Sequence, residues 1–92
     1  MRHTNVIALS LFALLLSASV SYASEEYYGT LESRPADTVG AWIVNWRNVD
    51  ATDKTRLIEE HGPLDVGACV EVEYEENAVK KIKSEDKEKC NK

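Results

Sequence analysis

Few side chains in this 92-residue sequence have the type and spacing that catalysis requires. Nucleophilic catalysis pairs a hydroxyl or thiol with a histidine or a similar base. After residue 23 the sequence has one histidine, His61, and its serines are Ser24, Ser33 and Ser84, none within a Gly-x-Ser-x-Gly motif. The sequence therefore predicts a protein that is not an enzyme.

Acidic residues offer a second kind of chemistry. Adjacent carboxylates occur at Glu25-Glu26, Glu59-Glu60 and Glu75-Glu76. Neighbours on a strand point to opposite faces, so these are poor acid/base pairs and indicate a solvated acidic surface. A hydrolase that uses an unrecognised acid pair is the least favoured alternative.

The segment from Glu59 to Asp65 is the candidate for a metal site. Glu59 and His61, with Glu60 and Asp65, could hold a divalent ion loosely. A zinc site usually draws four ligands from Cys and His, which the sequence does not supply. It also lacks Cys-x-x-Cys and Cys-x-x-Cys-His motifs, so we expect no cofactor.

Two tryptophans are the candidates for ligand contact. Trp42 lies in the middle of an apolar run, which favours a place in the core. Trp46 lies at the end of that run beside Arg47, which favours partial exposure. An exposed indole next to a guanidinium can stack on a ligand, so Trp46 and Arg47 form the predicted ligand-binding site.

Residues 1–23 have the pattern of a secretory signal peptide. Arg2 and His3 precede an apolar run over 6–16, and small residues at Ser21 and Ala23 fit a cleavage site before Ser24. The run is too short for a spanning helix, and we expect no lipid or membrane anchor. The sequence predicts a periplasmic or secreted protein.

Charge is divided unevenly along the rest of the chain. Without Arg2, ten basic residues face sixteen acidic ones. The segment 24–79 carries thirteen acidic and four basic residues, whereas 80–92 carries three acidic and six basic ones. An acidic body repels phosphate, so nucleic acid is not an expected partner.

Short alternating segments between turn signals predict an all-β domain. The expected strands are 26–33, 40–46, a short strand around Val49, 68–75 and 78–84, and the segment 55–60 is ambiguous between strand and helical turn. Five strands suggest a small OB-like or Greek-key barrel. We expect a signal peptide over 1–23, a barrel domain over 24–86 and a lysine-rich tail over 87–92.

The last hairpin has the most specific prediction. Glu76-Asn77 is expected to form its turn, since asparagine tolerates a left-handed conformation. One extra residue at Lys80-Lys81 is needed to set Val72 opposite Ile82, so we expect a β-bulge there. A helix over 78–89 is the second choice, because Val79 and Ile82 give it only one weak apolar stripe.

Cys69 and Cys90 are predicted to form a disulfide. An exported protein meets an oxidising compartment. In the alternation of its strand, Cys69 lies on the outward face, in phase with Glu71 and Glu73. The bulged register sets Cys69 near Glu85, which leaves just enough chain for Cys90 to turn back.

Several short motifs support a family resemblance. They are Gly29-Thr30-Leu31-Glu32, Gly40-Ala41-Trp42-Ile43-Val44, Val49, Thr55, Glu60-His61-Gly62 and Val66-Gly67-Ala68-Cys69-Val70-Glu71-Val72-Glu73. In this order they resemble an uncharacterised family of small exported bacterial domains, a domain of unknown function with OB-like five-stranded barrels. The resemblance covers almost all of the chain after residue 23. It implies the fold and export but no activity, cofactor or catalytic residue. The chain departs from the family pattern at Glu73-Tyr74, where a glycine is common, and in its lysine-rich tail.

These observations predict an exported, non-enzymatic binding or interaction module. Its expected partner is a periplasmic or extracellular protein, a peptide or a small ligand, and we expect a monomer. The alternative is a periplasmic accessory protein that binds a divalent cation or a small ligand through the acidic loop from Glu59 to Asp65.

Overall fold

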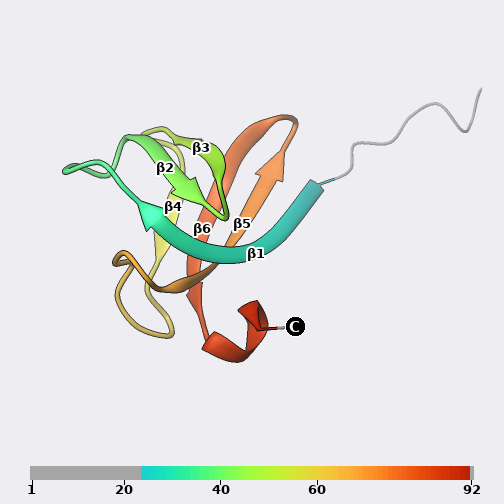
Figure 1. Ribbon diagram of the computed structural model, residues 1–92. Helices are drawn as coiled ribbons and strands as arrows, with labels where there is room; N and C mark the ends of the chain where they lie inside the picture. Colours follow the sequence, from blue (N-terminus) through green and yellow to red (C-terminus); the bar gives the residue numbers. More distant parts are fainter. Residues whose placement is uncertain (1–23, 92) are drawn as a thin grey trace, which may run out of the picture.

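The computed structural model describes residues 24–91, which are mostly β-strand (Figure 1). The elements are β1 (Ser24–Ser33), β2 (Gly40–Val44), β3 (Arg47–Ala51), β4 (Arg56–Ile58), β5 (Cys69–Glu75), β6 (Ala78–Glu85) and the short 3-10 helix η1 (Lys87–Cys90). The predicted signal peptide lies outside the described residues. The all-β prediction is confirmed.

The strands form one sheet in the order β3-β2-β1-β5-β6-β4. The long, curved β1 connects its two halves, because one end pairs with β2 and the other pairs with β5 (Figure 1). The ambiguous segment supplies a sixth strand, β4, which runs parallel to β6 with Leu57 opposite Ile82. The prediction of five strands is therefore wrong.

The ladder of this sheet is not closed, so the structure does not show the predicted barrel. Its two edge strands, β3 and β4, follow each other along the chain and are separated by a turn. In that turn Thr55 Oγ1 accepts a hydrogen bond from Thr52 N at 2.9 Å and donates one to Val79 O at 2.8 Å. The turn redirects the chain, so that β3 pairs with β2 and β4 pairs with β6.

The β5–β6 hairpin confirms the predicted register. Tyr74 lies opposite Val79 and Val72 lies opposite Ile82, with a register shift between Glu73 and Tyr74. Because Glu73 lies opposite Lys81, Lys80 is the extra residue of the bulge. The alternative helix over 78–89 is wrong.

The core lies on the concave side of the curved sheet. It consists of Leu31, Trp42, Val44, Val49, Ala51, Leu64, Val70, Val72, Val79 and Ile82. Strand alternation brings these residues together, since every second residue of a half-buried strand faces inward. Trp42 is fully buried, which confirms its predicted place in the core.

The disulfide between Cys69 and Cys90 is present, with the two Cα atoms 5.9 Å apart. It ties η1 against β1 and against the beginning of β5, and Cys69 is opposite Glu85 as predicted. An outward-facing Cys69, in phase with Glu71 and Glu73, predicts that the tail lysines Lys87 and Lys89 lie near acidic groups. Lys89 Nζ instead lies 5.6 Å from the centre of the Tyr28 ring, on the neighbouring strand.

The outward face of β5 is more buried than its acidic residues predict. Cys69 is 4% exposed and Glu71 is 6% exposed. β5 is a central strand between β1 and β6, and η1 contacts its beginning. Side chains of these neighbours therefore cover positions that alternation alone assigns to the solvent side.

Candidate functional site

The turn between β2 and β3 has an uncommon backbone conformation. Its two residues, Asn45 and Trp46, have φ angles of 53° and 69°. Two positive φ angles define a type I′ turn, in which Asn-Gly is the favoured pair. Asn45 fits this preference, whereas Trp46 occupies a position where glycine is far less strained.

Three hydrogen bonds fix this turn on β1. Asn45 donates its backbone N–H to Thr30 O at 3.0 Å, and its side-chain oxygen accepts from Thr30 N at 3.2 Å. Trp46 donates its backbone N–H to Glu32 Oε1 at 2.9 Å. A Cβ at Gly29 would lie 2.8 Å from Asn45 Cβ, so only glycine allows this close approach. The turn is therefore a docked tip and not a free loop.

Trp46 is 87% exposed at this tip. Alternation continued over the whole expected strand 40–46 predicts that Trp42, Val44 and Trp46 share one face, and this is wrong for Trp46. The strand ends at Val44, and the left-handed turn directs Trp46 away from the buried Trp42. The predicted exposure of Trp46 is confirmed, and it is nearly complete.

Arg47 is the other residue of the predicted ligand-binding pair. Its guanidinium lies 4.1 Å from the centre of the Tyr27 ring, a cation–π contact. Tyr27 in turn donates its hydroxyl to Val44 O at 3.1 Å. Burial raises the pKa of Tyr27, while the charge of Arg47 opposes the rise and Tyr74 adds to it. Arg47 is thus held beside β1, while Trp46 remains exposed.

A hollow of about 300 Å³ lies beside Arg47. Its other lining residues are Glu25 and Tyr74 on neighbouring strands and Glu76 and Asn77 in the β5–β6 turn. The sequence alone does not single out Tyr27 or Tyr74 as binding residues. Once β1 and β5 are paired, Tyr27 and Tyr74 lie on the same face of the sheet. That shared face is the signal that could have found them.

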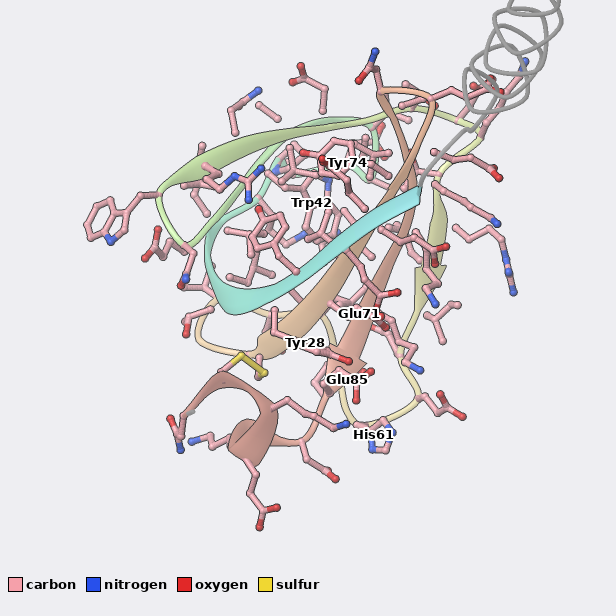
Figure 2. The ribbon with its side chains drawn as sticks, turned by 90° about the vertical axis from the view of Figure 1, so that its right-hand side faces the viewer. Tyr28, Trp42, His61, Glu71, Tyr74 and Glu85 are labelled. Atoms are coloured by element: carbon pink, nitrogen blue, oxygen red, sulfur yellow. A yellow bond between two sulfur atoms is a disulfide. The ribbon has the colours of Figure 1, made fainter. Side chains whose placement is uncertain are left out.

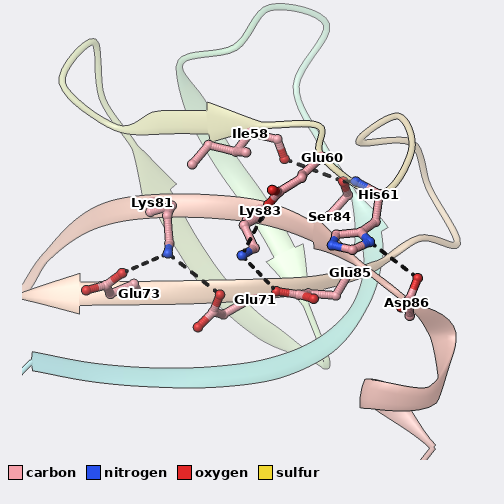
Figure 3. Close-up of polar contacts among 10 residues, drawn as sticks. All are labelled: Ile58, Glu60, His61, Glu71, Glu73, Lys81, Lys83, Ser84, Glu85 and Asp86. Carbon is pink, nitrogen blue, oxygen red and sulfur yellow. Dashed lines mark hydrogen bonds and ion pairs between the residues drawn. The ribbon is translucent and has the colours of Figure 1, made fainter.

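The outward face of β5 and β6 carries a network of ion pairs (Figure 3). Lys81 Nζ lies 3.7 Å from Glu71 Oε1 and 3.2 Å from Glu73 Oε1. Lys83 Nζ lies 3.3 Å from Glu85 Oε2 and 3.4 Å from Glu60 Oε1. These pairs provide the charges that make burial of acidic side chains tolerable on this face.

Glu71 is the acidic residue of this network that is buried as a whole residue. A hydrogen bond with the Glu26 carboxyl raises the pKa of Glu71, and burial adds to the rise. Lys81 and Lys83 oppose it. The network is a structural feature of the sheet, because each of its acids already has a charged or hydrogen-bonding partner.

Among the predicted metal residues, Glu59, Glu60 and His61 have partners within the chain. Glu59 Oε2 accepts a hydrogen bond from Leu64 N at 2.8 Å, and His61 Nδ1 lies 3.3 Å from Asp86 Oδ1 (Figure 3). Asp65 is exposed. Within residues 24–91, no three acidic, histidine or cysteine side chains gather as a metal site requires. A metal site in this loop stays a prediction.

The view in Figure 2 places Trp42 and Tyr74 toward β2 and β3, while Glu85 and His61 lie toward η1. The hollow beside Arg47 lies at the hairpin end of β5 and β6, whereas the turn that carries Trp46 is docked on Thr30, the strand partner of Cys69.

Comparisons with protein-family models, with curated proteins and with solved structures found no match for this chain. Across the described part of the chain, no helix has the length and apolar character needed to cross a membrane. The functional conclusion therefore rests on the chain's own residues.

Proposed function

We propose that this chain is an exported, non-enzymatic binding module that contacts its partner with the β2–β3 tip, residues 45–47. The observation that carries the proposal is Trp46, which is 87% exposed and has a positive φ. A large aromatic side chain at a glycine position costs stability and gains almost no burial within the fold. Strain of this kind is concentrated at functional sites.

The rigidity of the tip supports the same role. Its backbone is fixed by Thr30 and by the Glu32 carboxylate. A preorganised aromatic side chain loses little entropy when it binds, and tryptophan is enriched among the residues that dominate binding energy. The neighbouring Arg47, held on Tyr27, adds a charged group with a fixed position.

Trp46→Gly is expected to separate stability from binding. Glycine adopts the left-handed conformation without a Cβ penalty, so the variant should be more stable by about 1 kcal/mol. Its melting temperature should rise by roughly 4–8 °C. The same variant should no longer retain proteins from an extracytoplasmic extract that the immobilised wild-type chain retains, as measured by quantitative mass spectrometry.

Val66→Ser is the matched control for the binding measurement, because it removes another exposed apolar side chain, which is 64% exposed in the loop before β5. It should retain the same proteins as the wild-type chain. Equal retention by wild-type and Trp46→Gly chains would contradict the role of Trp46, and a lower melting temperature for Trp46→Gly would contradict the strain.

Export is the second part of the proposal. It is supported by the signal-like residues 1–23 and by the disulfide, which forms and persists in oxidising compartments. We expect mass spectrometry of the protein from the producing cells to find Ser24 as the first residue. A cytoplasmic protein that retains Met1 would contradict the proposal.

We further propose that the fold is OB-like and that the chain belongs with the small exported domains that it resembles. The OB-fold is a five-stranded, partly open Greek-key barrel. The order β3-β2-β1-β5-β6, in an incompletely closed sheet with β4 added beside β6, supports this relation.

A further inference from the structure

The outer edge of β3 has unused backbone hydrogen-bonding groups. Val44 and Arg47 close the two-residue turn, so they form a hydrogen-bonded pair, and the pairs alternate from there along the strand. The N–H and C=O groups of Asn48 and Asp50 therefore point away from β2. Within residues 24–91, β3 is an edge strand, and no backbone hydrogen bond connects it to β6.

Two hollows lie along this edge. The hollow beside Arg47 and a second hollow of about 300 Å³ beside Asn48 and Asp50 share two lining residues, Tyr74 and Asn77. They are therefore adjacent, with β3 on one side and the β5–β6 hairpin, whose strand β6 contacts β3, on the other. We call this feature the β3 groove.

The β3 groove has an acidic lining. Glu25, Glu76 and Asp50 contribute three carboxylates. The one cation, Arg47, has its guanidinium stacked on Tyr27. This charge is complementary to lysine or arginine side chains and unfavourable for acidic ones.

We propose that the β3 groove binds an extended, basic peptide segment of a partner protein, which adds to β3 as a further strand. The backbone of the segment exchanges hydrogen bonds with Asn48 and Asp50, as in other cases of strand addition to a sheet edge. Its alternate side chains lie over Tyr74 and beside the carboxylates of Asp50 and Glu76. This inference rests on the proposed binding function and names the partner class, but it does not require Trp46.

Fluorescein-labelled Lys-Val-Lys-Val-Lys-Val is the probe, and Glu-Val-Glu-Val-Glu-Val is the charge-reversed comparison. Binding is measured by fluorescence anisotropy with the chain after residue 23 and its disulfide intact. The lysine peptide should bind at least about tenfold more tightly than the glutamate peptide. Equal affinities, or no binding of the lysine peptide, would overturn the proposal.

N-methylation tests for strand addition. In a strand, the N–H groups of alternate residues point to the same side. One peptide is methylated on the backbone nitrogen of every lysine, and another on the backbone nitrogen of every valine. One of the two should lose affinity by about tenfold or more, and the other should bind like the parent. Equal losses, or no loss in either, would show that the peptide binds by charge alone and would overturn the proposal.

Two variants of the chain complete the test. Glu76→Lys reverses an exposed charge in the β5–β6 turn and should weaken binding of the lysine peptide by about threefold or more. Val66→Ser, in the loop before β5, should leave that affinity unchanged. If Trp46→Gly abolishes retention of extracytoplasmic proteins while the peptides do not bind, the groove inference fails and the proposed function stands. An unchanged affinity of Glu76→Lys for the lysine peptide would also contradict the groove inference.

Discussion

Trp42→Ala is expected to lower the free energy of unfolding by about 3–5 kcal/mol. Trp42 is fully buried and is the largest of the fully buried side chains. Its removal deletes apolar contacts and leaves a cavity between β2 and the rest of the core. A domain of this size has a total stability of only about 3–10 kcal/mol, so the variant should be largely unfolded or close to it.

Specific polar contacts add to the effect of Trp42. Its indole N–H donates to Thr38 O at 3.0 Å, which holds the loop after β1. The Arg34 guanidinium lies 4.4 Å from the centre of its ring and also donates to Leu64 O at 2.6 Å. Loss of the indole therefore loosens the contact between that loop and Leu64, a core residue from the segment before β5.

Trp46→Ala is the matched control, since it removes the same side chain from an exposed position. Its effect should be within about 0.5 kcal/mol of zero. Urea unfolding followed by far-UV circular dichroism measures both variants. Similar losses for the two variants would show that Trp42 does not have its central place in the core.

Reduction of the Cys69–Cys90 disulfide is expected to lower the free energy of unfolding by about 3 kcal/mol. The bond closes a loop with a sequence separation of 21, and the chain-entropy account assigns that stabilisation to the restricted unfolded chain. The loop contains all of β6, so the bond constrains the last hairpin and η1 together. Urea unfolding with and without reductant measures the difference.

The Cys69→Ala/Cys90→Ala double variant is the control for this experiment. It should unfold at the same urea concentration with and without reductant, and close to reduced wild-type chain. In the reduced wild-type chain and in the double variant, η1 is no longer tied to β5. The amide hydrogen of Lys89, which donates to Asp86 O at 3.0 Å, should therefore exchange with solvent faster in both. A difference below about 0.5 kcal/mol between oxidised and reduced chains would contradict the prediction.

Local patterns in the sequence determined the last hairpin and the disulfide. The alternation of β5 and the turn at Glu76-Asn77 leave few registers, and matching Val72 with Ile82 requires one extra residue. That register then fixes Cys69 opposite Glu85 and brings Cys90 within reach. These features follow from neighbours in sequence, because an antiparallel hairpin is a local structure.

The sequence also indicated which tryptophan belongs to the core and which is exposed. It did not determine the degree of exposure or the conformation of Trp46. Those depend on the docking of the turn on β1, through Gly29, Thr30 and Glu32, which are distant in sequence. Only the tertiary structure places a tryptophan in a left-handed position on a rigid tip.

Long-range pairing decided the rest. The segment 55–60 has no clear period, and it becomes β4 because β6 offers a free edge parallel to it. The sheet stays open because the turn at Thr52–Thr55 leads the chain from β3, which pairs with β2, to β4, which pairs with β6. The outer edge of β3 is therefore left unpaired. Glu71 is buried because β1 and β6 flank its strand. Periodicity in the sequence indicates which residues share a face of a strand. Which neighbouring strands cover that face, and which strand edge stays unpaired, is decided only when strands distant in sequence pair.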